Sequence, residues 1–165
     1  MLKSINYQLK DINLAIDFIL KNITSKTLLF NGAMGSGKTT IINAILNEFK
    51  NWKSVVIGDE PREKYFFKHK NLDLLGWLNH DKTLKYYERS KIAVSPSTWE
   101  EPFGRTSMEA GSRGCATIIS NKGGITETNL NSIILKKLTA SEIYKNIKYL
   151  ISNETKAKKI HRESF

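Results

Sequence analysis

Short apolar runs alternate along the chain with stretches whose apolar residues fall at helical spacing. Runs of four or five buried-type residues between helical patterns favour parallel strands covered on both faces. The expected strands lie near residues 27–31, 53–57, 71–75, 92–95, 116–119 and 132–135. The pattern therefore predicts a single α/β domain over residues 1–165, with one doubly wound, mainly parallel sheet and helices on both faces.

The two ends of the chain carry weaker signals. Residues 4–9 alternate apolar and polar side chains, which is typical of an edge strand. Asp11 is a candidate cap for a helix with apolar residues at helical spacing over 12–20. Residues 155–165 are basic and polar, and we expect a terminal helix that frays.

The most informative stretch lies between the expected strands at 92–95 and 116–119. It holds a loop with two prolines and then a helix that opens near Gly104. A helix that opens at the carboxyl end of a parallel strand directs unpaired N–H groups into the crevice, which suits a phosphate. Glu101 closes the loop and Glu109 lies further along the helix, so their carboxylates flank the anion site. Carboxylates in that position suit the hydroxyls of a sugar.

The run Glu101-Pro-Phe-Gly-Arg-Thr-Ser-Met-Glu109 resembles the signature of retaining glycosyltransferases of family 4, which belong to the GT-B group. The resemblance implies that Glu101 lies at the donor sugar as the catalytic residue and that Glu109 holds the ribose. The residues that it assigns to donor binding are Phe103, Gly104, Arg105, Thr106 and Glu109. The simpler interpretation is a helix start with a capping acid and a Glu109–Arg105 pair.

Further segments resemble the same family. They are the Gly58-Asp-Glu-Pro61 turn, the strand and turn at 71–78, the helix at 81–90 and the Gly-Gly loop at 121–127. Residues 50–155 therefore look like a Rossmann-like donor-binding domain, followed by a basic tail at 156–165. A GT-B enzyme also has an acceptor-binding domain, for which no residues are evident here, so catalysis by this chain alone is not expected.

The first 49 residues carry a different motif. Gly32-x-x-x-x-Gly37-Lys38-Thr39 matches the P-loop pattern in a strand–loop–helix context, with a further glycine at Gly35. Residues 1–49 resemble the start of the TsaE-type ATPase of tRNA threonylcarbamoyladenosine synthesis. That resemblance implies ATP bound at Lys38, Mg²⁺ held by Thr39, and partners from tRNA modification.

The two resemblances meet in one strand–helix unit. Gly32 stands where a family 4 donor domain has the glycine after its first strand, and Ala33 replaces the arginine that clamps the diphosphate. Lys38 falls where the family lysine is expected, so it serves either interpretation. Asp59 and Glu60 are candidate Walker B acids, but their Gly-Asp-x-Pro context fits the glycosyltransferase pattern better.

Composition adds a basic charge and few special residues. The chain has 165 residues and a net charge of +10, which suits a phosphorylated small molecule, a polyanion or an anionic membrane face, or reflects an AT-rich genome. The single cysteine, Cys115, lies in an apolar run and is predicted to be a core residue. The three histidines show no metal-site spacing. With no apolar signal core or membrane-length run, a cytoplasmic location is expected.

The three tryptophans are candidate stacking surfaces. Trp52 and Trp77 are predicted to pack in the core at strand edges, whereas Trp99 is left open between packing and stacking on a ligand.

The leading hypothesis is a glycosyltransferase-type domain that binds a nucleotide-diphosphate sugar. In it Lys38, Gly104, Arg105 and Thr106 take the diphosphate and no metal is required. The alternative is a P-loop ATPase that uses ATP and Mg²⁺ in tRNA modification. A third possibility is a non-catalytic hybrid of the two.

Overall fold

The computed structural model describes residues 26–31, 38–58 and 68–163. Its strands are β1 (Thr27–Asn31), β2 (Lys53–Ile57), β3 (Leu72–Gly76), β4 (Ile92–Ser95), β5 (Ala116–Ile119) and β6 (Ile133–Ile134). Its helices are α2 (Lys38–Glu48), α3 (His80–Tyr87), α4 (Arg105–Ser112), α5 (Ile125–Thr128), α6 (Ala140–Ser152) and α7 (Glu154–Glu163). The predicted strands agree with these bounds to within about a residue.

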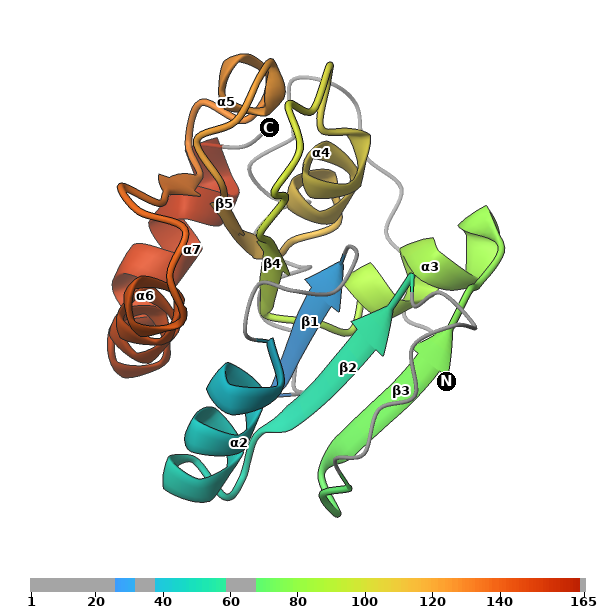
Figure 1. The fold of residues 1–165 in the computed structure, drawn as a ribbon, viewed down its shortest axis with the longest axis vertical. Coiled ribbons are helices and arrows are strands. Elements are labelled where there is room, and N and C mark those ends of the chain that lie inside the picture. Colours follow the sequence, from blue (N-terminus) through green and yellow to red (C-terminus); the bar gives the residue numbers. More distant parts are fainter. Residues whose placement is uncertain (1–25, 32–37, 59–67, 164–165) are drawn as a thin grey trace.

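The strands form one six-stranded sheet in the order β3-β2-β1-β4-β5-β6, and every neighbouring pair is parallel (Figure 1). The predicted doubly wound α/β sheet is confirmed. From β1 the chain winds outward through β2 and β3, and then returns to place β4 on the other side of β1. Such a reversal leaves a crevice at the carboxyl ends of the two central strands, where α/β proteins bind their ligands.

Alternate residues of the central strands point into two separate cores. Phe30 of β1 packs on one side in a cluster that includes residues of α2, α6 and α7. Leu29, its neighbour, packs on the other side with Tyr87 of α3 and Ala110 of α4. Because successive side chains of a strand point to opposite faces of the sheet, one apolar run contributes residues to both cores. Cys115 is fully buried in the second core, as predicted.

The tryptophan predictions have opposite outcomes. Trp52 is buried beside the first core, which confirms the prediction. The prediction for Trp77 is wrong, because its side chain is 79% exposed. The chain turns at Gly76, which has φ +62°, and Trp77 follows this turn at the end of β3 instead of lying on the strand. Leu75 and Leu78 pack against the second core on either side of it.

The ends of the chain are described in part. The predicted edge strand at 4–9 and the predicted helix from Asp11 lie outside the described residues, as does the loop at 32–37. Residues 156–163 of the basic tail belong to α7, and Ile160 of that helix is buried in the first core. Among the described helices, none combines the length and apolar character needed to cross a membrane.

Candidate functional site

A pocket of about 390 Å³ lies at the carboxyl edge of the sheet, over the point where the strand order reverses. It receives residues from the ends of β1, β2 and β4, from the loops after β3 and β4, and from α3, α4 and α5. The polar and aromatic residues that line it include Asn31, Trp77, Thr83, Tyr87, Ser95, Trp99, Glu101 and Thr106. Its position is therefore the one that the fold itself predicts for a ligand.

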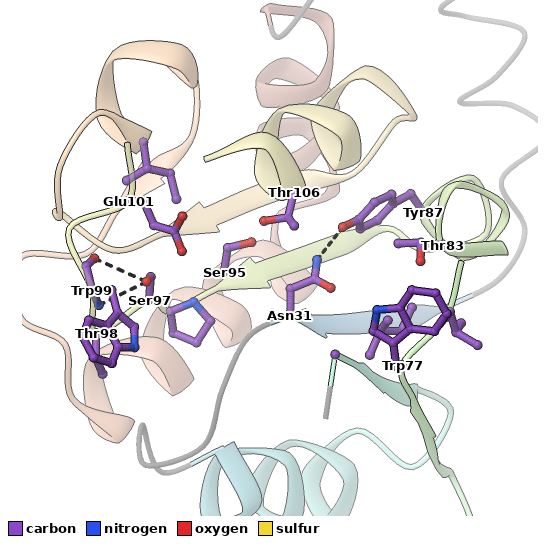
Figure 2. Close-up of a pocket in the computed structure, with 15 residues that line it drawn as sticks. Asn31, Trp77, Thr83, Tyr87, Ser95, Ser97, Thr98, Trp99, Glu101 and Thr106 are labelled. Carbon is purple, nitrogen blue, oxygen red and sulfur yellow. Dashed lines mark hydrogen bonds between the residues drawn. The ribbon is translucent and has the colours of Figure 1, made fainter. Parts of the chain in front are cut away.

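The pocket has two distinct ends, each marked by an exposed tryptophan. Figure 2 shows Trp77 with Thr83 and Tyr87 on one side, and Trp99 with Glu101 on the other. The side chains of Trp77 and Trp99 are 79% and 74% exposed. Large exposed aromatic rings on a pocket wall offer a flat apolar surface to a ring of the ligand.

The floor between the two ends is polar. Asn31 Nδ2 donates a hydrogen bond of 2.6 Å to the hydroxyl of Tyr87 (Figure 2). Burial raises the pKa of Tyr87 well above its ordinary value, and the nearby charge of Glu109 raises it further, so the phenol stays protonated. The hydroxyl of Ser95 is buried and has no hydrogen-bond partner within the described part of the chain. A buried hydroxyl without a partner is costly, and a polar ligand atom would satisfy it.

Glu101 is held by the Gly-Gly turn that follows β5. Residues 101 and 123 form an isolated parallel bridge, and the N–H of Gly124 donates to the carbonyl of Glu101 over 2.7 Å. A Cβ atom on Gly123 would lie 2.5 Å from that same carbonyl oxygen. A Cβ atom on Gly124 would lie 2.2 Å from the carbonyl oxygen of Pro102. Both glycines are therefore needed for the approach that fixes the Glu101 loop.

The start of α4 lies between the two ends of the pocket. Gly104 caps it with φ +71°, and no side chain caps the N–H groups of the first turn. The turn is held from behind, because the hydroxyl of Ser107 donates to the carbonyl of Gly104 and accepts from the amide of Asn129. Thr106 lines the pocket. The helix thus presents unsatisfied N–H donors and a positive dipole end beside the polar floor.

Glu109 lies one turn beyond Thr106 on the same face of α4. Its side chain is 18% exposed, and Oε1 lies 3.1 Å from Nε2 of His80, the first residue of α3. The simpler interpretation expected Glu109 to pair with Arg105. Among the described residues, Glu109 pairs with His80 instead. Glu109 does not itself line the pocket, but its partner His80 begins the helix that carries Thr83 and Tyr87, two residues at the Trp77 end.

The structure brings together only part of the predicted site. Glu101 and Thr106 line the pocket. Phe103 and Arg105 are exposed beside it, at the start of α4. Gly32, Gly35 and Gly37 lie outside the described residues, and so do the side chains of Lys38 and Thr39, whose backbone begins α2. The roles assigned to all of these residues stay predictions.

Five residues of the site escaped the motif-based prediction: Asn31, His80, Thr83, Tyr87 and Ser95. Asn31 and Ser95 each end a buried strand, and a polar residue at the end of a central strand is a usable signal for a ligand crevice. Tyr87 and His80 lie on α3 and reach the site only through the packing of α3 against α4. No local pattern marks them.

A doubly wound sheet with a polar crevice and a helix N-terminus at its switch point is an arrangement in which many α/β proteins bind phosphorylated ligands. The family model described as "Glycosyl transferases group 1" matches residues 16–164, and the chain belongs to this family. The match includes the Gly32–Thr39 run, which the sequence had suggested to be a P-loop. None of the matches described here favours the ATPase alternative.

Two curated relatives are similar over most of the chain. An uncharacterized glycosyltransferase of Methanocaldococcus jannaschii is 31% identical over 114 residues, which is 62% of this chain and 29% of the relative. The lipopolysaccharide 1,2-N-acetylglucosaminetransferase of Salmonella typhimurium is 30% identical over 127 residues, which is 64% of this chain and 33% of the relative. The matched segments therefore span about a third of each relative.

Solved structures show the same fold. Anabaena HepE in complex with UDP-glucose superposes with a TM-score of 0.69 and 17% identity, over 96% of this chain and 47% of that one. A glycosyltransferase from Rickettsia africae gives a TM-score of 0.68 and 21% identity, over 96% and 46%. The catalytic domain of the cholesterol-alpha-glucosyltransferase of Helicobacter pylori gives 0.67 and 16%, over 86% and 95%.

Proposed function

We propose that the pocket binds a nucleotide-diphosphate sugar, as the donor-binding domain of a retaining glycosyltransferase. The observation that carries the proposal is the order of groups along the pocket. An uncapped helix start lies between two carboxylates, Glu109 toward one end and Glu101 at the other. A donor of this class has the same order of parts: a nucleoside with ribose hydroxyls, a diphosphate, and a sugar with hydroxyls.

The proposal gives each part of the donor a place. The nucleoside lies toward Trp77, with its ribose at Glu109 and its base against the exposed ring. The diphosphate lies at the start of α4, near Thr106 and Arg105. Lys38, which the sequence predicts to bind phosphate, also contacts it in this proposal. The sugar lies toward Glu101. The family membership of the chain supports this assignment, and so does the ligand of one fold neighbour, HepE, whose crystal structure contains UDP-glucose.

The chemistry follows from the same layout. In glycosyl transfer the bond between the anomeric carbon and the diphosphate oxygen breaks, and the leaving diphosphate keeps the electron pair. The acceptor hydroxyl forms the new bond to that carbon and loses its proton. Helix N–H groups and cationic side chains placed at the diphosphate stabilise the charge that develops on it. In this proposal that charge is met without a metal ion.

The pocket accounts for the donor only, and we propose that transfer also needs an acceptor-binding domain of the GT-B type. Association with an anionic membrane face stays a prediction from the net charge of +10. Sedimentation with anionic vesicles but not with neutral ones, at low salt, would support it.

Calorimetric titration of one sample with UDP-, GDP- and ADP-sugars and with ATP–Mg²⁺ tests the function. We expect a nucleotide sugar to bind, and both Lys38→Ala and Arg105→Ala to weaken it by about 1.5–3 kcal/mol, because each removes one charged phosphate contact. Arg113→Ala is the matched control. Arg113 follows α4 at its other end, where it pairs with Glu88 over 2.6 Å, and its loss should leave the affinity unchanged.

A different pattern would overturn the proposal. Binding of ATP–Mg²⁺ alone, abolished by Lys38→Ala and unaffected by Arg105→Ala, would favour the ATPase alternative. No binding of any of the four ligands would favour the non-catalytic hybrid.

A further inference from the structure

We infer that His80 is a positioning residue for the donor ribose. It holds one carboxylate oxygen of Glu109 so that the other oxygen accepts a hydrogen bond from a ribose hydroxyl, and it thereby gives the pocket its preference for ribonucleotides over deoxyribonucleotides. The inference rests on the proposed function, because it takes Glu109 as the ribose-binding group.

The contact joins two helices that are distant in sequence. His80 is the first residue of α3 and Glu109 lies on α4, and Nε2 of the first is 3.1 Å from Oε1 of the second. Nε2 acts as the donor in this contact, because a carboxylate only accepts. Oε2 of Glu109 has no hydrogen-bond partner among the described residues. One oxygen is therefore engaged by the protein and the other is left for a ligand.

The backbone that carries His80 is fixed independently of the ligand. Asn79 caps α3, and its side-chain oxygen accepts from the N–H of Lys82 over 3.0 Å. The hydroxyl of Thr83 donates to the backbone carbonyl of Asn79 over 3.1 Å. Thr83 itself lines the pocket. The capped start of α3 thus fixes the backbone of His80 beside the Trp77 end of the pocket.

The side chain of Glu109 can adopt several rotamers, but ribose binding requires one of them. A glutamate has three side-chain torsions, and ordering it when a ligand arrives costs affinity. Its side chain is 18% exposed and reaches from α4 to the start of α3, whereas the His80 side chain is 64% exposed. A charge-assisted hydrogen bond from His80 orders the carboxylate before the ligand binds.

The consequence is a specificity that can be measured. A site whose acceptor is matched to a hydroxyl discriminates against an analogue that lacks the hydroxyl, because the acceptor then loses its partner. Loosening Glu109 should reduce that discrimination more than it reduces the affinity for the phosphates. The ratio of affinities for a nucleoside diphosphate and its deoxy analogues therefore reports on His80, and folding stability does not enter it.

The experiment titrates UDP, GDP, ADP and CDP, each with its 2′-deoxy and 3′-deoxy forms, against the parent chain. The base that binds most tightly is carried forward. We expect the parent to prefer the ribose form by about tenfold or more for at least one hydroxyl, the scale of a hydrogen bond to a charged group. His80→Ala should lower that ratio by about threefold or more, and His80→Gln, which keeps an N–H donor, should restore part of it.

Two further variants separate positioning from loss of structure. In a Glu109→Ala background, His80→Ala should change the ratio no further, because the two residues act as one unit. Asp81→Ala alters the same first turn of α3 without touching Glu109, and should leave the ratio at the parent value. Thermal unfolding of all variants checks that they fold.

The outcomes are distinguishable. If the parent binds none of the nucleoside diphosphates, the proposed function fails. If the parent binds and discriminates but His80→Ala keeps the full ratio, or lowers it equally in the Glu109→Ala background, the role of His80 is wrong and the donor pocket stands.

Discussion

At the scale of single residues, Ser95 is the sharpest indicator of a ligand, because its buried hydroxyl faces the pocket without a partner. Ser95→Ala should leave the free energy of unfolding unchanged or raise it slightly, since it removes a buried polar atom that the protein does not satisfy. The same change should weaken nucleotide-sugar binding by about 0.5–1.5 kcal/mol, the net worth of one hydrogen bond.

Ser54, near the amino end of β2, provides a matched control. Ser54 in β2 has an equally buried, unpartnered hydroxyl outside the pocket. Ser54→Ala should affect stability as Ser95→Ala does and leave binding alone. Denaturant unfolding and calorimetry measure the two effects, and equal loss of affinity in both variants would remove Ser95 from the site.

The same scale shows what the sequence could and could not predict about the site. Glu101 and Thr106 line the same pocket and belong to one gapless run, in which a strand end, a loop and a helix start follow local rules, while their roles stay predictions. His80 was not predicted, because only the packing of α3 on α4 brings it to Glu109. Trp77 was misplaced because apolar character alone does not say whether a residue just past a strand faces the core or a crevice.

At the scale of elements, the strands were predictable because both faces of the sheet are covered. The runs that form β1, β4 and β5 are buried throughout, so each reads as continuous apolar sequence. The edge strand β6 has one neighbour and only two residues, Ile133–Ile134, where four were expected. The order of the strands depends on nonlocal pairing and could not be read from any single element.

The Gly-Gly turn is the element on which the Glu101 loop depends. Gly124→Ala should destabilise the fold by about 1–3 kcal/mol, the range for forcing extra atoms into a packed site, because its Cβ would meet a backbone oxygen 2.2 Å away. Binding of the sugar nucleotide should fall more than binding of the free nucleoside diphosphate, since Glu101 faces the sugar in the proposed layout.

Gly76→Ala is the comparison for this test. Gly76 has φ +62° but no atom within 4 Å of an added Cβ, so only backbone strain of about 1 kcal/mol is expected. Chemical denaturation compares the two variants, and titration with UDP and UDP-glucose compares the ligands. Equal weakening of both ligands by Gly124→Ala would speak against the link between this turn and the sugar.

At the scale of the whole molecule, we propose that the chain folds as one domain. The segment that resembled a separate P-loop unit supplies β1, which pairs with β2 on one side and β4 on the other, and α2, which packs in the same core as α6. No independent sheet is left for it to form among the described residues.

One cooperative unfolding transition is therefore expected. Circular dichroism, which follows all helices, and the fluorescence of the buried Trp52, isolated by replacing Trp77 and Trp99 with phenylalanine, should give the same midpoint in urea. Two separated transitions, with Trp52 reporting only one of them, would show instead that the first part of the chain unfolds by itself.

Because β1 lies between β2 and β4 in the sheet, its two neighbours become available at different times during synthesis. Leu28 finds its partner Ile92 only after the intervening chain has left the ribosome, whereas the partner on the other side, Ser54, arrives much earlier. Until then the innermost strand of the mature sheet is an open apolar edge, the kind of surface at which nascent chains pair wrongly with one another. A strand from the middle of the finished sheet is thus one whose hydrogen bonds are completed late, and the ligand crevice beside it forms only when β4 docks.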